Sequence, residues 1–320
     1  MSFSGMVKEE LSMQKSRARH CQIAELSAII SMCGNVIIDS RDNYRLKICT
    51  ENIAVVRKSF TLIRKAFNIR TDIAVRTNRG NGNISYLLAV KDPSEAQRIL
   101  EAVKLRSDNG DIYEELSVVR NVVIQQSCCK RAFIRGAFLA GGSMSDPQKA
   151  YHFEIVCAAE AKAMQLRDII NSFDLDAKIV KRKKAYVVYL KEGTQIVDVL
   201  NVMEAHVALM NLENIRILKE MRNSVNRKVN CETANINKTV SAAVKQLEDI
   251  QYIKDTVGFE KLSEGLLEVA LMRLQYPEAT LKELGSLLTT PVGKSGVNHR
   301  LRKLSEIAEK VRENKEVHYD

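Results

Sequence analysis

The segment from Gly136 to Pro147 joins a run of small residues to an acidic side chain, and the two together could serve metal chemistry. Gly136, Ala140 and Gly141 lie in an apolar helical pattern. Because Gly and Ala have almost no side chain, another backbone can approach very closely there. Asp146 follows at the end of this helix. Metal-assisted cleavage of a phosphodiester bond needs carboxylates that hold divalent cations beside the scissile phosphate.

The segment resembles, in degenerate form, the LAGLIDADG motif of homing endonucleases, in which two packed helices each deliver one metal-binding aspartate to DNA. This resemblance places Asp146 on the metal-binding position. The matching residue of an earlier segment is Ile38, with Asp39 one residue later. Met144 replaces the first acid of the motif, and Pro147 replaces its final glycine. One carboxylate opposite an isoleucine cannot form a symmetric metal site, so we expect no catalytic residue, no bound metal and no cofactor.

Asp146 also has a structural interpretation. The tripeptide Ser145-Asp146-Pro147 fits a turn that ends a helix, because Asp is favoured before Pro. Residual metal binding by Asp146 is the alternative.

The small-residue helix belongs to a degenerate internal duplication with an offset of about 107 residues. Each copy has the predicted element order α-β-α-β-β-α. The strands are predicted where apolar residues alternate with polar ones, and the helices where apolar residues recur at spacings of three and four. We expect an α+β domain over residues 1–210, in which the two small-residue helices pack about a pseudo-two-fold axis. The first copy ends with a strand pair around Thr71–Val90 and a helix near Ser94–Leu105. The second copy ends with a strand pair around Ala177–Leu190 and a helix near Thr194–Met203.

The charge of the chain favours an anionic partner. Its formal net charge is +10 and its pI is about 9.2, which puts nucleic acid first. Residues 1–210 hold 31 basic and 23 acidic residues, a net of +8; residues 211–320 hold 18 and 16, a net of +2. The broad electrostatic surface is therefore expected in the first domain.

Basic side chains gather at the two predicted hairpins, where they are well placed to contact the phosphates of double-stranded DNA. Solvated turns without a partner are the alternative. The side chains are Arg76 and Arg79 in the first copy, and Lys181, Arg182, Lys183 and Lys184 in the second.

Strand patterns stop near Asn211. The segment 211–237 is rich in asparagine, which suits turns and helix caps, and it is predicted to be a linker. Residues 238–320 are predicted to form an all-α domain, with its first helices at Lys238–Asp255 and Ser263–Leu274.

The end of the chain has the pattern of a helix-turn-helix. Thr280 and Glu283 form a capping box, Pro291 and Gly293 break the chain, and Ser295 is placed to cap the next helix. In this motif the second helix enters the major groove.

That second helix has an apolar stripe at Val297, Leu301, Leu304, Ala308 and Val311. Asn and Arg side chains near a helix N-terminus hydrogen-bond adenine and guanine edges, so we expect its polar face to bind DNA. An ordinary solvated face is the alternative. The candidate DNA-binding residues are Ser295, Asn298, His299, Arg302 and Lys303.

Seven scattered cysteines form no CxxC pair and no Cys/His spacing typical of zinc sites, which indicates reduced thiols in a cytosolic protein. The first twenty residues lack the apolar core of a signal peptide. No apolar run approaches the roughly 20 residues that span a bilayer. We expect a cytoplasmic, nucleoid-associated protein with no membrane contact and no small-molecule substrate.

Four segments in combination resemble the WhiA family of bacterial regulators: Val7–Leu11, Arg135–Pro147, Asn226–Asn235 and Gly293–Leu304. The resemblance implies a degenerate LAGLIDADG domain joined to a helix-turn-helix domain. It also implies a DNA-binding role in sporulation-type development, cell division and chromosome segregation.

We therefore expect a non-enzymatic, sequence-specific DNA-binding transcriptional regulator. RNA polymerase and other transcription or division proteins are further candidate partners. One alternative is a metal-dependent endonuclease or nickase of the LAGLIDADG type. Another makes the first domain a protein-docking module and leaves DNA contact to the C-terminal domain.

Overall fold

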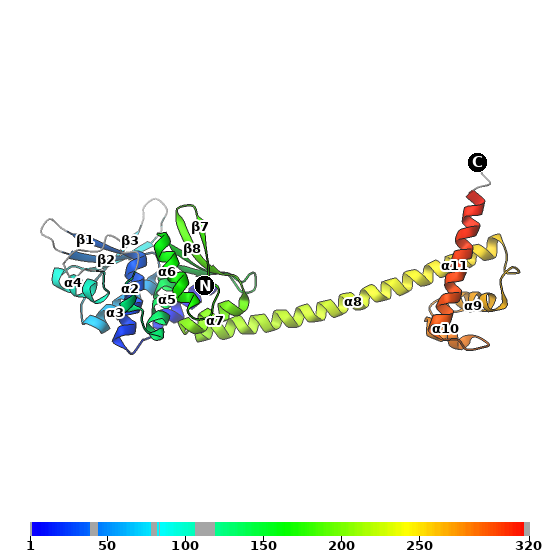
Figure 1. Cartoon of the computed structure of the whole chain (residues 1–320), viewed down its shortest axis with the longest axis horizontal. Helices are drawn as coiled ribbons and strands as arrows, with labels where there is room; N and C mark the ends of the chain where they lie inside the picture. The colour runs from blue at the N-terminus through cyan, green and yellow to red at the C-terminus, as the bar shows by residue number, and fades with distance from the viewer. Residues whose placement is uncertain (1, 39–43, 78–81, 83, 106–118, 317–320) are drawn as a thin grey trace. The chain divides into compact units, whose positions relative to one another are not determined.

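The computed structural model describes residues 2–38, 44–77, 82, 84–105 and 119–316. The chain divides into two compact units, Met1–Glu220 and Met221–Asp320 (Figure 1). In the described part of the chain, no helix is both long and apolar enough to cross a membrane.

The first unit contains two copies of one α-β-β-α-β-β-α arrangement, preceded by helix α1 (Phe3–Met13). The predicted order lacked the strand that directly follows the first helix of each copy. Both missing strands are short and begin with glycine, so they show little of the alternation that marks a strand. The first copy is α2 (Arg19–Cys33), β1 (Gly34–Ile38), β2 (Tyr44–Thr50), α3 (Ile53–Phe67), β3 (Asp72–Thr77), β4 (Ile84–Val90) and α4 (Pro93–Ala102). The second is α5 (Ser127–Gly141), β5 (Gly142–Met144), β6 (Phe153–Cys157), α6 (Glu160–Asn171), β7 (Lys178–Arg182), β8 (Ala185–Leu190) and α7 (Gly193–Met203).

The two copies build matching antiparallel sheets. The strand order is β1-β2-β4-β3 in the first sheet and β5-β6-β8-β7 in the second. Equivalent pairs also have equivalent registers, with Leu46 opposite Val90 and Phe153 opposite Leu190. The predicted α+β fold class with its duplicated domain is confirmed.

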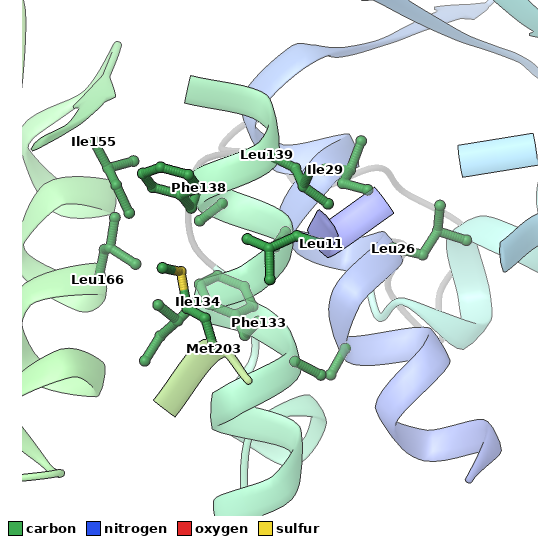
Figure 2. Close-up of a cluster of buried hydrophobic side chains, with 14 of the residues drawn as sticks. Leu11, Leu26, Ile29, Phe133, Ile134, Phe138, Leu139, Ile155, Leu166 and Met203 are labelled. Atoms are coloured by element: carbon green, nitrogen blue, oxygen red, sulfur yellow. The ribbon is translucent and has the colours of Figure 1, made fainter. Parts of the chain in front are cut away.

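Helices α2 and α5 pack against each other at the centre of the unit. A Cβ atom added to Gly136 would lie 2.4 Å from the backbone oxygen of Glu25, so the two helix backbones touch where glycine leaves room. Apolar side chains from both copies surround this contact, among them Leu26, Ile29 and Phe138 (Figure 2). The prediction that another backbone packs closely against the small-residue helix is confirmed.

A buried ionic cluster crosses the same helix pair. Glu25 of α2 has no exposed surface, and its Oε1 accepts from Arg135 Nε of α5 and from Lys58 Nζ of α3, each at 2.9 Å. Arg135 and Lys58 are 2% and 1% exposed. Arg135 Nη1 also lies 2.8 Å from the half-exposed Glu204 carboxylate, so two carboxylates compensate the two buried cations and Glu25 is the buried one.

The start of the next helix, α8 (His206–Thr256), is held by α1. The Glu10 carboxylate accepts from the backbone N–H of Val207 at 2.8 Å and of Ala208 at 2.9 Å. Gln14 Nε2 donates to Glu204 Oε2 at 2.7 Å. The Val7–Leu11 segment thus supplies a carboxylate that satisfies free N–H groups of the first turn of α8.

The prediction that 211–237 contains turns is wrong, because α8 runs through this segment without interruption and the boundary between the units falls inside it. Asparagine costs less than about 1 kcal/mol per residue relative to alanine in a helix. The segment contains neither Gly nor Pro, so a helix already formed on both sides propagates through it. Domain boundaries at 210 and 237 stay a prediction.

The second unit contains the C-terminal part of α8 with α9 (Glu264–Gln275), α10 (Leu281–Leu287) and α11 (Lys294–Glu316). These helices share a small apolar core of Ile250, Ile253, Val269, Ala270, Leu284, Leu288, Val297, Leu301, Leu304 and Ala308. The predicted all-α character of this part of the chain is confirmed.

Candidate nucleic-acid interface

Helix α11 divides into an apolar and a polar face, as its sequence predicted. Val297, Leu301, Leu304 and Ala308 are at most 1% exposed, and Val311 is half-buried. The five candidate residues of the polar face are all exposed: Ser295, Asn298, His299, Arg302 and Lys303. The polar face is therefore free of the second unit's own core and open to a partner.

The predicted cap of α11 is wrong by two residues. The helix begins at Lys294, and the carbonyl of Gly293 accepts from the N–H groups of Gly296 and Val297. Gly293 thus holds the cap position, and Ser295 lies inside the first turn. The exposed ammonium of Lys294 lies at the same end of the helix. Lys294 was not among the DNA-binding residues predicted from the sequence.

Glycine fixes how closely α10 and α11 approach. A Cβ atom on Gly285 would lie 2.1 Å from the backbone oxygen of Val292. Val292 N–H in turn donates to the Gly285 carbonyl at 3.0 Å. Since the loop backbone lies directly against α10, α11 leaves the turn in one fixed direction.

Two polar contacts hold the start of α10. The predicted capping box is present, with Thr280 and Glu283 bonded to each other's backbone N–H groups. The buried Arg273 of α9 donates to Gln246 of α8 and, at 2.6 Å, to the carbonyl of Ala279. The scaffold of α11 is therefore anchored through α8 and α9.

The Arg302 guanidinium is 79% exposed and lies 3.3 Å from the Glu306 carboxylate one turn later. An exposed pair at this spacing contributes only about 0.3–0.5 kcal/mol. Arg302 can therefore exchange Glu306 for a base edge at small cost.

The basic run of the second copy lies at the β7–β8 hairpin, as predicted. Lys181, Arg182, Lys183 and Lys184 are all exposed, and Lys183 has a positive φ of 55° at the turn. Arg182 Nη1 also lies 3.0 Å from Glu154 Oε2. In the first copy, Arg76 is exposed on β3, whereas Arg79 lies outside the described residues.

Strand register identifies further basic side chains on the face of the first sheet that points away from the helices. In the first sheet Leu46 and Ile48 are buried, so Arg45 and Lys47 of β2 occupy the opposite face. Arg76, paired with Ser85, lies on that face too. The candidate list from sequence omitted Arg45 and Lys47, although their alternation with Leu46 and Ile48 was the signal that could have found them.

Asp146 is not at a helix end. Helix α5 stops at Gly141, and Asp146 is exposed beyond β5, where its Oδ1 accepts from Gln148 N–H at 2.9 Å. Its carbonyl accepts from Lys149 N–H at 2.9 Å, so the residue forms a turn. Within the described residues, Asp146 joins no group of three or more metal-ligating side chains. Of its predicted counterparts, Ile38 ends β1 and Asp39 lies outside the described residues.

Family models match most of the chain. The WhiA N-terminal LAGLIDADG-like domain matches residues 19–106, the WhiA LAGLIDADG-like domain matches residues 130–222, and the WhiA C-terminal HTH domain matches residues 225–308. The matches follow the two copies of the first unit and then the helices of the second.

Several relatives align over nearly the whole length. The chain is 56% identical over 314 residues to a probable cell division protein WhiA of Lachnoclostridium phytofermentans, with 98% of this chain and 100% of the relative covered. It is 51% identical over 317 residues to a protein of the same name from Alkaliphilus oremlandii, with 98% and 99% covered. A crystal structure of full-length WhiA from Thermatoga maritima is 25% identical, with a TM-score of 0.59 and coverage of 97% and 99%.

Proposed function

Because this chain belongs to the WhiA family, we propose that it is a non-enzymatic transcriptional regulator that binds double-stranded DNA at specific sequences. The observation that carries the proposal is the exposed polar face of α11, presented by a helix-turn-helix with a rigid turn. In such motifs the N-terminal residues of the second helix contact base edges in the major groove.

The first unit, in this proposal, adds affinity that does not depend on sequence. Its cations contact phosphates, and phosphate contacts position a protein on DNA without carrying sequence information. The candidate contacts are Arg45, Lys47 and Arg76 on the first sheet and Lys181, Arg182, Lys183 and Lys184 at the β7–β8 hairpin. A docking surface for RNA polymerase or a division protein is the second candidate role of this unit.

The names of the relatives indicate a biological role for the proposed regulator. The relatives are called probable cell division proteins, so a regulatory role in cell division is the first biological assignment to test. Roles in sporulation-type development and chromosome segregation rest on the family resemblance alone. A location at the nucleoid in the cytoplasm rests on the unpaired cysteine pattern and on the proposed DNA binding.

The protein is expected not to cut DNA with Mg²⁺ or Mn²⁺. Asp146 is committed to a turn, and a two-metal or one-metal cleavage site needs carboxylates that converge on the scissile phosphate. The full-length protein is incubated with metal and a supercoiled plasmid that carries a site it binds, and nicked and linear forms are measured. Metal-dependent nicking that is lost in Asp146→Ala would show the endonuclease alternative to be correct.

Replacing Lys181, Arg182, Lys183 and Lys184 with Ala is expected to flatten the dependence of log affinity on log salt. Each lost phosphate contact reduces the slope by about 0.9, whereas the preference among base sequences stays the same. The measurement is a set of binding isotherms on specific and random duplexes at several salt concentrations.

The matched control is Arg64→Ala/Lys65→Ala, which removes two exposed cations from the last turn of α3. This control variant is expected to keep the wild-type slope. An unchanged slope in the hairpin variant would remove this run from the DNA surface and favour the protein-docking role.

A further inference from the structure

Two pairs of metal-ligating side chains meet at the N-terminal ends of the two central helices. His20 and Cys21 are the second and third residues of α2, and Cys128 and Cys129 hold the same two places in α5. One ring nitrogen and three thiol sulfurs lie within 4.8 Å of one another. The duplicated fold thus brings four ligands together from two distant segments, and the proposed DNA binding uses none of them.

The distances inside this cluster suit a tetrahedral ion. His20 Nδ1 lies 3.1 Å from Cys129 Sγ and 3.4 Å from Cys21 Sγ. In a tetrahedral zinc site the Zn–S and Zn–N bonds place neighbouring ligand atoms roughly 3.4–3.8 Å apart. Shifts of about 1 Å or less, within reach of side-chain rotation, therefore complete the tetrahedron.

The cluster lies at the N-terminal ends of both central helices. In neither helix does the side chain of the cap residue, Ala18 or Gln126, bond to a backbone N–H of the first turn. Gln126 Oε1 instead accepts from the Cys128 thiol at 3.4 Å. Free N–H groups and the positive end of the helix dipole stabilise a thiolate at such a position. Two helix termini act here on one cluster.

The two basic residues that flank the ligands in the sequence, Arg19 and Lys130, are engaged elsewhere, whereas Lys104 lines the same pocket as His20 and Cys129. The Arg19 guanidinium lies over the Phe67 ring, 5.8 Å from its centroid. Lys130 Nζ donates to Ser172 Oγ at 3.1 Å. With these two cations directed away, a metal ion is the charge that can best stabilise several thiolates at once.

We propose that His20, Cys21, Cys128 and Cys129 bind one Zn²⁺ ion in a structural Cys₃His site. Four protein ligands leave no open coordination position, so the site is structural and not catalytic. The ion joins the N-terminal ends of α2 and α5, while Asp146 lies beyond the C-terminal end of α5. A pocket that His20 and Cys129 line gives the ion a path to the cluster.

Zinc binding by this cluster is coupled to proton release, because only the thiolate form of cysteine binds the ion. Each cysteine that becomes a thiolate ligand releases its proton to solvent.

The test is a titration of the full-length, fully reduced protein with Co²⁺ under anaerobic conditions. We expect the visible d–d bands of tetrahedral cobalt and a thiolate-to-cobalt charge-transfer band, saturating at about one ion per chain. Added Zn²⁺ should then abolish both signals. Protein purified without chelator should contain zinc by elemental analysis, and chelation should lower its melting temperature.

Cys128→Ser is the informative variant, because Cys128 is exposed and its replacement disturbs no packing. It should weaken Co²⁺ binding at least tenfold and remove part of the charge-transfer intensity. Cys231→Ser, at an exposed cysteine of α8, is the matched control and should leave the titration unchanged.

Three results would overturn the assignment. The first is the absence of tetrahedral cobalt bands in the reduced protein. The second is an unchanged titration in Cys128→Ser. The third is a reduced protein that binds no metal and that, in air, loses free thiols to a Cys21–Cys129 or Cys21–Cys128 disulfide. That result would identify a redox pair instead of a metal site.

Discussion

Glu25→Gln is expected to lower the free energy of unfolding of the first unit by about 3–5 kcal/mol. The carboxylate is fully buried and is shared by the Arg135 guanidinium and the Lys58 ammonium. Removing one partner of a buried ion pair leaves charge in a low-dielectric interior. Without Glu25, Lys58 keeps the carbonyls of Leu11 and Gln14 as acceptors, and Arg135 keeps the half-exposed Glu204 carboxylate. The measurement is urea unfolding of the full chain, combined with hydrogen exchange of the α2 and α5 amides.

Asp168→Asn is the matched control for this acid-to-amide change. Asp168 pairs with Arg167 on the surface with 65% of its side chain exposed, and such pairs contribute about 0–1 kcal/mol. A loss in Glu25→Gln no larger than in the control would mean that the buried cluster does not stabilise the fold.

The loss of stability in Glu25→Gln is expected to depend on pH. Burial lowers the pKa of Lys58, and Glu25 opposes this shift. A lysine with a lowered pKa in the folded state binds fewer protons there than in the unfolded chain, so stability rises with pH up to the ordinary lysine pKa. Without Glu25 the pKa of Lys58 falls further. The stability difference between wild type and Glu25→Gln should therefore narrow as the pH rises above neutral.

Arg302→Ala and Asn298→Ala are each expected to cost roughly 1–3 kcal/mol of binding to the preferred DNA sequence, which is about 5- to 150-fold in affinity. Both side chains are exposed within the first nine residues of α11, and the N-terminal part of the second helix of such a motif contacts base edges. The preferred sequence is first selected from random duplexes, and affinities are then measured on this site and on random DNA. The loss on random DNA should be much smaller.

Lys310→Ala is the control on the same helix, because Lys310 is exposed but lies about two turns beyond Arg302. It should change both affinities little. Equal losses on preferred and random DNA in Arg302→Ala would assign Arg302 to the phosphate backbone and move sequence recognition elsewhere.

Local patterns in the sequence correctly predicted the elements that bury one face. The stripe from Val297 to Ala308 specified which side of α11 is buried, since a period of 3.6 residues places these positions on one side whatever packs there. The Thr280–Glu283 capping box likewise needs only its own four residues. Such features depend on neighbours along the chain.

The errors arose where local preference was weak. Asparagine suits turns, yet the Asn226–Asn235 segment is helical because no Gly or Pro stops propagation from either side. Asp146 was assigned to a helix end from the motif, whereas the Gly142 backbone already turns into β5 and leaves Asp146 to a later turn.

The amino-acid sequence by itself determined the duplicated α+β domain, the helix-turn-helix with its polar face, and a small-residue helix suited to close packing. Only the tertiary structure decided what that packing brings together. Glu25 and Arg135 are 110 residues apart, and His20 and Cys129 are 109 apart, so no local spacing reveals either contact. Both follow from one physical fact: glycine at position 136 lets α2 and α5 touch, and residues along the facing sides of the two helices then become neighbours.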